Sequence, residues 1–155
     1  MTATAPYTTA EVREIERIQI DERGTPGFTL MQRAGEAAFQ HCLPYLRETD
    51  KALVITGPGN NGGDGYVVAR LLLEAGYGVT LISLSDPTRL KGDAAKARDD
   101  FLRFGSIERF NGELPTADLV VDALLGTGLD RPLQGDYLVT AQLINEQSAP
   151  VIAID

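Results

Sequence analysis

Gly57-Pro58-Gly59-Asn60-Asn61-Gly62-Gly63-Asp64-Gly65 joins a short apolar run, residues 52–55, to a segment with apolar residues at helical spacing. A glycine-rich turn between a strand and a helix is typical of nucleotide-binding α/β proteins. Glycines permit positive φ angles and close approach of the backbone, and main-chain N–H groups at a helix N-terminus attract an anion. A tight turn with a good helix cap needs fewer glycines than this. We therefore predict that the stretch holds the phosphate-bearing part of a nucleotide-like ligand.

Polar side chains distinguish this stretch from an ordinary dinucleotide-binding loop. At Asn60, Asn61 and Asp64 this stretch has two amides and a carboxylate, where such a loop usually has smaller side chains. Asp64 is able to cap the following helix, but its carboxylate would repel a phosphate placed directly on that N-terminus. We therefore expect Asp64 to face a ribose, a hydroxyl group or a cation.

Strand-like and helix-like segments alternate along the rest of the chain. Four apolar runs are expected to be buried strands, beginning at Ala52, Val79, Leu119 and Val151. Two amino-terminal helices open at Thr-containing capping patterns, and later helices are expected over residues 65–75, 93–104 and 136–147. Alternation of this kind predicts βαβ units and a parallel sheet with helices on both faces. Right-handed crossovers then bring the loops that follow strands to one edge, where ligands bind.

Composition restricts the class of protein. The chain has 155 residues, 43% of them hydrophobic, which suits one domain with its own core. Its net charge of −8 argues against a nucleic-acid partner and against binding to an anionic membrane surface. Cys42, the only cysteine, lies in an apolar helical pattern, so we expect a buried, unreactive thiol in a reducing compartment. No run resembles a signal peptide or a membrane span, so we expect a cytoplasmic protein.

Asp122 stands inside the third apolar run. A buried carboxylate is costly unless it is paired or bound to a cation. At the ligand edge it could meet Asn61 across neighbouring strands, and such oxygen ligands suit a weakly hydrated monovalent ion. The alternative is that Asp122 only caps its own loop through backbone N–H groups.

Two further segments belong to the expected ligand edge. The loop 126–132 contains two glycines and Arg131, which is either a phosphate ligand or a solvated surface residue. Asp155 ends the fourth run, where a carboxylate suits ribose contact or proton transfer, although it is equally a simple strand end. His41, the only histidine, is expected on the surface of the second helix, away from these loops.

These residues resemble the NAD(P)H-hydrate epimerase family. Residues 57–70, 121–129 and 151–155 look like its three signatures, and Met31-Gln32-Arg33-Ala34-Gly35 also fits. In that family the third signature continues as Ile-Pro-Ser-Gly, whereas this chain stops at Asp155. The resemblance therefore predicts that residues 1–155 form an epimerase domain that lacks its carboxy-terminal part, as a truncated piece of a longer protein.

The resemblance implies a Rossmann-like three-layer αβα fold with a mainly parallel central sheet. It implies an isomerase that interconverts the R and S forms of hydrated NADH and NADPH in metabolite repair, beside an ADP- or ATP-dependent dehydratase that is often fused to it. It also implies a homo-oligomer and a potassium ion held by Asn61 and Asp122. Substrate contacts are implied for two loops and the chain end, namely Asn60, Asn61, Gly62, Gly63, Asp64, Gly126, Thr127, Gly128, Leu129, Asp130, Arg131, Pro132 and Asp155.

A carboxylate is the expected proton-transfer group, either Asp155 or Asp64, because no histidine is expected near the site. Two other functions stay open. One is a non-catalytic nucleotide-binding or protein-interaction module of the same fold. The other is an NAD(P)-dependent oxidoreductase, in which Asp86 after the second strand would bind the adenine ribose. The bulky Asn60-Asn61 pair and the lack of a Tyr/Lys or His catalytic set argue against the oxidoreductase.

Overall fold

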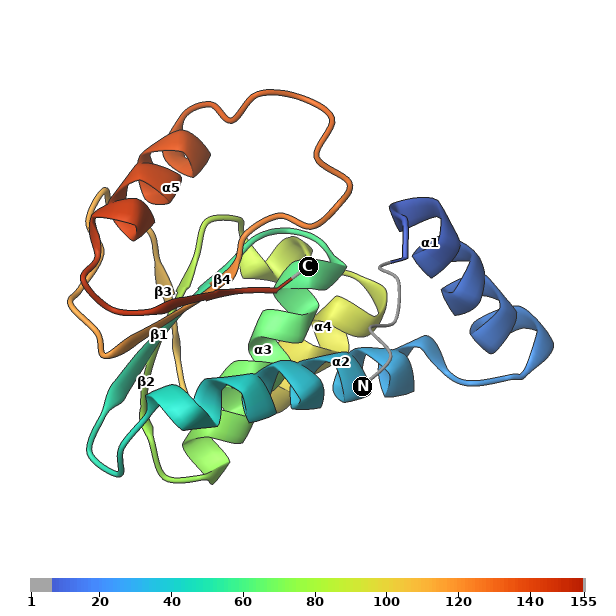
Figure 1. Cartoon of the computed structure of the whole chain (residues 1–155), viewed down its shortest axis with the longest axis horizontal. Helices are drawn as coiled ribbons and strands as arrows, with labels where there is room; N and C mark the ends of the chain where they lie inside the picture. The colour runs from blue at the N-terminus through green and yellow to red at the C-terminus, as the bar shows by residue number, and fades with distance from the viewer. Residues whose placement is uncertain (1–6, 155) are drawn as a thin grey trace, which may run out of the picture.

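A five-stranded parallel sheet forms the middle layer of the computed structural model, which describes residues 7–154 (Figure 1). The strands are β1 (Lys51–Thr56), β2 (Gly78–Ser83), β3 (Ile107–Arg109), β4 (Leu119–Ala123) and β5 (Val151–Ala153). All neighbours pair in parallel, in the spatial order β3-β2-β1-β4-β5. The four predicted strands are confirmed. β3 was not predicted, because three residues that include Glu108 and Arg109 make no apolar run.

Helices cover both faces of the sheet, as the alternating pattern predicted (Figure 1). One face carries α2 (Gly27–Cys42), α3 (Asn60–Glu74) and α4 (Gly92–Phe101), and the other carries α5 (Asp136–Glu146). Single helical turns occupy η2 (Leu43–Tyr45) and η3 (Pro87–Arg89). The fold is therefore a three-layer αβα arrangement, as expected. None of the helices among residues 7–154 has both the length and the apolar character needed to cross a bilayer.

Two hydrophobic cores hold the layers together. The larger lies beneath α2, α3 and α4, where the rings of Tyr66 and Phe101 pack with their centroids 6.0 Å apart. The smaller lies beneath α5 and includes Leu53, Ile55 and Ile144. Alternate residues of β1 enter opposite cores, as the pleat of an inner strand requires.

Cys42, at the end of α2, is fully buried in the larger core. Burial in apolar surroundings raises the pKa of its thiol to about 11, so the nucleophilic thiolate is scarce at neutral pH. The predicted burial of the cysteine is thereby confirmed, and the raised pKa is in line with an unreactive thiol. His41, its neighbour, is exposed on α2 as predicted, with Nδ1 3.0 Å from the carbonyl oxygen of Ala37.

The first helical segment differs from the others in its packing. α1 (Thr9–Arg17) begins with the predicted capping box: Thr8 Oγ1 accepts from the N–H of Glu11, and the Glu11 carboxylate accepts from the N–H of Thr8. It continues into a π-helical turn, η1 (Ile18–Glu22). No residue of α1 or η1 is buried. In Figure 1, α1 lies beside the layered part of the molecule and is not packed into it.

Candidate functional site

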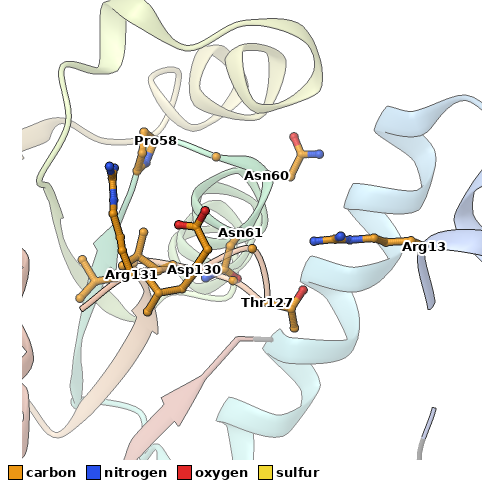
Figure 2. A pocket seen from close by; sticks show the side chains of 13 residues that line it. Arg13, Pro58, Asn60, Asn61, Thr127, Asp130 and Arg131 are labelled. Atoms are coloured by element: carbon orange, nitrogen blue, oxygen red, sulfur yellow. The ribbon is translucent and has the colours of Figure 1, made fainter. Parts of the chain in front are cut away.

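A large cavity lies at the carboxyl edge of the sheet, between β1 and β4. This is the switch point of an open parallel sheet, because the chain leaves β1 toward β2 on one side and reaches β4 on the other. The cavity measures about 460 Å³, within the usual range for ligand pockets. It brings together the glycine stretch and the loop after β4, as predicted, and is lined by Arg13, Pro58, Gly59, Asn60, Asn61, Leu124, Leu125, Gly126, Thr127, Gly128, Leu129, Asp130 and Arg131 (Figure 2).

Glycines in the β1–α3 connection are there for close packing. A Cβ atom on Gly57 would overlap the carbonyl oxygen of Leu124, and one on Gly62 would overlap the carbonyl oxygen of Gly57. A Cβ on Gly65 would lie 2.6 Å from Cβ of Ala123 and 3.0 Å from Cγ2 of Thr56. The predicted close approach is confirmed. The positive φ that glycine permits is not used here, since every positive-φ glycine among the described residues lies outside 57–65.

Helix α3 begins earlier than predicted, at Asn60, so residues 60–65 are helical. The N-cap is Gly59, and no side chain caps the helix, so the prediction that Asp64 caps it is wrong. The N–H of Gly63 already donates to the carbonyl oxygen of Gly59 across 3.1 Å. The N–H groups without a helical acceptor therefore belong to residues 60–62, and they, not those of Gly63 and Gly65, form the anion-attracting end.

Asp64 is half-buried in α3 and lines a second cavity of about 440 Å³, beneath α1. Asn60, Asn61 and Thr127 line this cavity as well, so it adjoins the first. Asp64 therefore lines the adjoining cavity and not the 460 Å³ cavity itself. This position is consistent with the expectation that Asp64 faces something other than a phosphate.

Asn61 is 8% exposed, and within the described part of the chain neither Oδ1 nor Nδ2 of its amide has a hydrogen-bond partner. An unpaired buried amide costs free energy, so a site of this kind is built for a group that the chain does not supply. The amide oxygen is a suitable ligand for a hard cation.

Asp122 lies in β4 opposite Ile55, a residue of the core beneath α5. Its Oδ1 accepts from the N–H of Leu124 at 3.0 Å, so the alternative that it caps its own loop is realised. Burial raises the pKa of the Asp122 carboxyl, and the Leu124 hydrogen bond offsets part of this. No recorded contact in residues 7–154 joins Asp122 to Asn61. Both residues nevertheless lie at the carboxyl edge of the sheet. A cation close to them would compensate the buried charge of Asp122, so the two side chains are suitable ligands for the expected ion.

Among residues 7–154, no group of three or more His, Cys, Asp or Glu side chains is arranged so that it could hold a metal ion. The ligand set that the sequence predicted combines one amide with one carboxylate, so it does not depend on such a cluster. One-charge oxygen sites of this kind favour a monovalent ion over a transition metal.

The loop after β4 forms the second wall of the cavity. Gly126, Thr127, Gly128, Leu129, Asp130 and Arg131 all line it, and from Thr127 onward these residues are exposed. Pro132 instead lines a smaller adjoining cavity of about 200 Å³, together with Leu133 and Tyr137. In Figure 2, Asp130 and Arg131 lie on the side of the cavity where Pro58 stands.

Arg13 is a lining residue that sequence reasoning missed. It projects from α1 toward Asn60, Asn61 and Thr127 (Figure 2), and it lines both the 460 Å³ and the 440 Å³ cavity. The capping box predicted the helix, but nothing in a surface helix pattern tells which loop the helix faces. The only local signal was one more arginine among the charges of residues 11–17.

Two other candidate residues are Asp155 and Asp86. Asp155 is outside the described residues, so its predicted catalytic and binding roles stay predictions. Asp86 follows β2 and caps η3, where Oδ1 accepts from the N–H and the hydroxyl of Thr88 at 3.0 and 2.7 Å. These hydrogen bonds lower the pKa of Asp86, with smaller contributions from Arg109 and Arg89. Asp86 lines a cavity of about 290 Å³ that shares Pro58 with the 460 Å³ cavity, but Asp86 does not line the latter and its carboxylate is already engaged by Thr88.

Known proteins resemble this chain along nearly its whole length. A family model described as YjeF-related protein N-terminus matches residues 27–155. An NAD(P)H-hydrate epimerase of Rhodobacter capsulatus is 42% identical, over 98% of this chain and 76% of the relative. The bifunctional NAD(P)H-hydrate repair enzyme Nnr of Escherichia coli is also 42% identical, over 94% of this chain but 28% of the relative.

A solved structure has the same fold as this chain. The crystal structure of yeast ynu0 superposes with a TM-score of 0.82, covering 98% of this chain and 70% of that one, at 22% sequence identity. The chain thus spans about three quarters of one curated relative and little more than a quarter of the other.

Proposed function

Since this chain belongs to the family of YjeF-related protein N-termini, we propose that it interconverts the R and S forms of hydrated NADH and NADPH for nicotinamide nucleotide repair. Relatives that are 36–42% identical over nearly all of this chain are NAD(P)H-hydrate epimerases or a bifunctional NAD(P)H-hydrate repair enzyme. The observation that carries the proposal is the 460 Å³ cavity, where the start of α3 faces the loop after β4. It is large enough for a substantial part of a dinucleotide.

The substrate's phosphates would lie at the start of α3. Three N–H groups there have no helical acceptor, and the helix dipole adds partial positive charge. A Cβ atom on Gly59, the N-cap, would meet nothing within 4 Å, so the backbone at the start of the helix is open on that side. Backbone donors also explain how a chain with a net charge of −8 can bind an anion.

The reaction centre is the ring carbon that bears the added hydroxyl group on the reduced nicotinamide. Epimerisation inverts this carbon either by loss and re-addition of water or by ring opening and reclosure, and both routes return every atom to the product. Each route needs a proton donor and acceptor. The groups we assign are Asp64, which lines the cavity beneath α1, and Asp155.

A potassium ion would be held by Asn61 and Asp122. It would supply positive charge near the phosphates and satisfy the unpaired amide oxygen of Asn61. The proposal is supported by the raised pKa of Asp122, because a carboxylate that is costly to ionise alone becomes favourable beside a cation.

The cellular setting follows from the same proposal. The relatives from Escherichia coli and Coxiella burnetii are bifunctional NAD(P)H-hydrate repair enzymes, of which this chain matches 28% and 31%. We assign an ADP- or ATP-dependent dehydratase as the partner activity, a homo-oligomeric state and a cytoplasmic location.

The test is R/S equilibration of hydrated NADPH, followed by chromatographic separation of the epimers. We expect activity in the wild type and a loss of about 100-fold or more in kcat when the proton-transfer carboxylate is removed by Asp64→Asn or Asp155→Asn. Asn61→Ala should abolish any stimulation by potassium. Asn145→Ala, at an exposed position on α5, is the matched control and should behave as wild type. Binding of NADP⁺ with no epimerisation would instead support a non-catalytic module.

A further inference from the structure

Arg13 has no structural role that accounts for its position. It lies on α1, where no residue is buried, and no ion pair within residues 7–154 involves it. Arg17, one turn later on the same helix, is different: its guanidinium pairs with Glu14 at 2.8 Å and with Glu22 at 3.0 Å. Both arginines are exposed on the same helix, but within residues 7–154 only Arg17 of the two forms ion pairs.

The Arg13 guanidinium is directed at the candidate site. In Figure 2 it extends from α1 into the space between Asn60 and Thr127. Its Nη2 lies 4.0 Å from the position that a Cβ atom would occupy on Gly128. The side chain lines both adjoining cavities, so it stands at the place where they meet.

This position suits an anion held between two walls. Asn60 and Asn61 line the cavity at the start of α3, where the first N–H groups have no helical acceptor, and Arg13 lines it from α1. The charged residues that line the 460 Å³ cavity are Arg13, Arg131 and Asp130, whereas Glu16 and Asp64 line the adjoining 440 Å³ cavity, so the excess of positive charge lies on the 460 Å³ side, in a chain whose net charge is −8. A guanidinium presents a planar fork of donors that matches two oxygens of a phosphate group.

We propose that Arg13 binds the diphosphate of the dinucleotide substrate and that α1 is therefore a functional wall of the site. The inference rests on the proposed function, since it names the part of hydrated NADH or NADPH that this side chain contacts. It assigns no step of the chemistry to Arg13. Its effect is on binding, and it reaches the substrate from a segment outside both glycine-containing loops.

Arg13→Ala, Arg13→Lys and the matched control Arg17→Ala test this inference. A charge-assisted hydrogen bond to phosphate contributes about 10-fold in affinity, so Arg13→Ala should raise the KM for hydrated NADPH about 10-fold with kcat within about two-fold. Arg13→Lys should recover part of the loss, because it keeps the charge but not the fork. Arg17→Ala should leave KM unchanged. Titration calorimetry with NAD⁺ and with ADP-ribose should show the same order of affinities.

The outcomes separate this inference from the proposed function. Equal KM values for Arg13→Ala and Arg17→Ala, in an active enzyme, would overturn the role of Arg13 and leave the epimerase intact. If the wild type binds NAD⁺ in an Arg13-dependent way but does not epimerise the hydrates, the proposed function fails and the diphosphate contact stands. A structural effect is detected by thermal unfolding, which should be the same for Arg13→Ala and the wild type.

Discussion

The two sides of the candidate site are built in different ways. On one side, the β1–α3 connection is held by backbone packing: Gly57 and Gly62 are buried, and neither has room for a Cβ atom. On the other side, α1 buries no residue and contributes an exposed arginine. The first wall is fixed by the same contacts that fix the sheet. The second wall, α1, is positioned by helix propensity and a few surface contacts. What it contributes to the site is the charge of Arg13.

This difference separates stability from binding. Substitutions in the packed wall should change the free energy of unfolding, because they disturb contacts between β1, β4 and α3. Substitutions in α1 should change ligand affinity or local opening and leave global unfolding almost unaltered, because few contacts would be lost.

The largest expected effect is that of Gly57→Ala. Its Cβ would overlap the Leu124 carbonyl oxygen, a backbone atom that cannot move without disturbing β4. We expect the free energy of unfolding in urea to fall by about 3 kcal/mol or more. Gly59→Ala is the control, since a Cβ there meets nothing within 4 Å, and it should cost less than about 0.5 kcal/mol. Equal stability of the two variants would show that the wall is not packed as described.

The second expected effect is the dependence of stability on pH that the buried Asp122 carboxyl causes. Burial raises the pKa of Asp122 above its ordinary value of 3.8, so the folded chain keeps this proton to a higher pH than the unfolded chain. The contribution of Asp122 to the free energy of unfolding therefore falls as the pH rises from its pKa in the unfolded chain through its raised pKa in the folded chain. Above that range the full cost of the buried carboxylate remains.

Asp122→Asn keeps an oxygen to accept from Leu124 and removes this cost. In potassium-free buffer at pH 8, we expect urea unfolding to give a gain of about 1 kcal/mol for the variant, and a smaller gain at pH 4. Added potassium should stabilise the wild type and reduce the difference. A variant that is less stable than the wild type at pH 8 without potassium would contradict the desolvation argument.

The smallest effect on global stability is expected in α1. Thr8→Ala removes the capping box, which should destabilise this helix by about 1 kcal/mol. The free energy of global unfolding should fall by less than about 0.5 kcal/mol, because no buried contact is lost. Hydrogen exchange should show amides of α1 exchanging about five-fold faster and those of β1 unchanged. A global loss as large as that of Gly57→Ala would mean that α1 unfolds with the core.

The sequence predicted the layered fold well because strands and helices have different apolar spacing. β1 and β4, buried on both faces, appear as continuous apolar runs. β3 could not be found, since its half-exposed residues have no such pattern. The start of α3 was misplaced because glycine is a poor helix former, and only the tertiary contacts of Gly62 and Gly65 show why glycines occupy the first turns of a helix.

The two loops of the site could be predicted because a parallel sheet places them at one edge. Arg13 could not, because its place in the site depends on how α1 is oriented outside the layered fold. The relation between Asn61 and Asp122 was predicted from strand adjacency alone. The structure adds that one is unpaired and the other hydrogen-bonded to Leu124, a difference that no local pattern contains.

The packed wall also contains an oxidisable atom. A Cβ atom on Gly63 would lie 2.7 Å from Sδ and 2.6 Å from Cε of Met31, so the thioether of α2 fills the space that this glycine leaves open. Conversion of Met31 to the sulfoxide would add a polar oxygen at an apolar contact against the first turns of α3. Oxidation of Met31 would therefore disturb the packing of α2 against the first turns of α3, from which the backbone donors project.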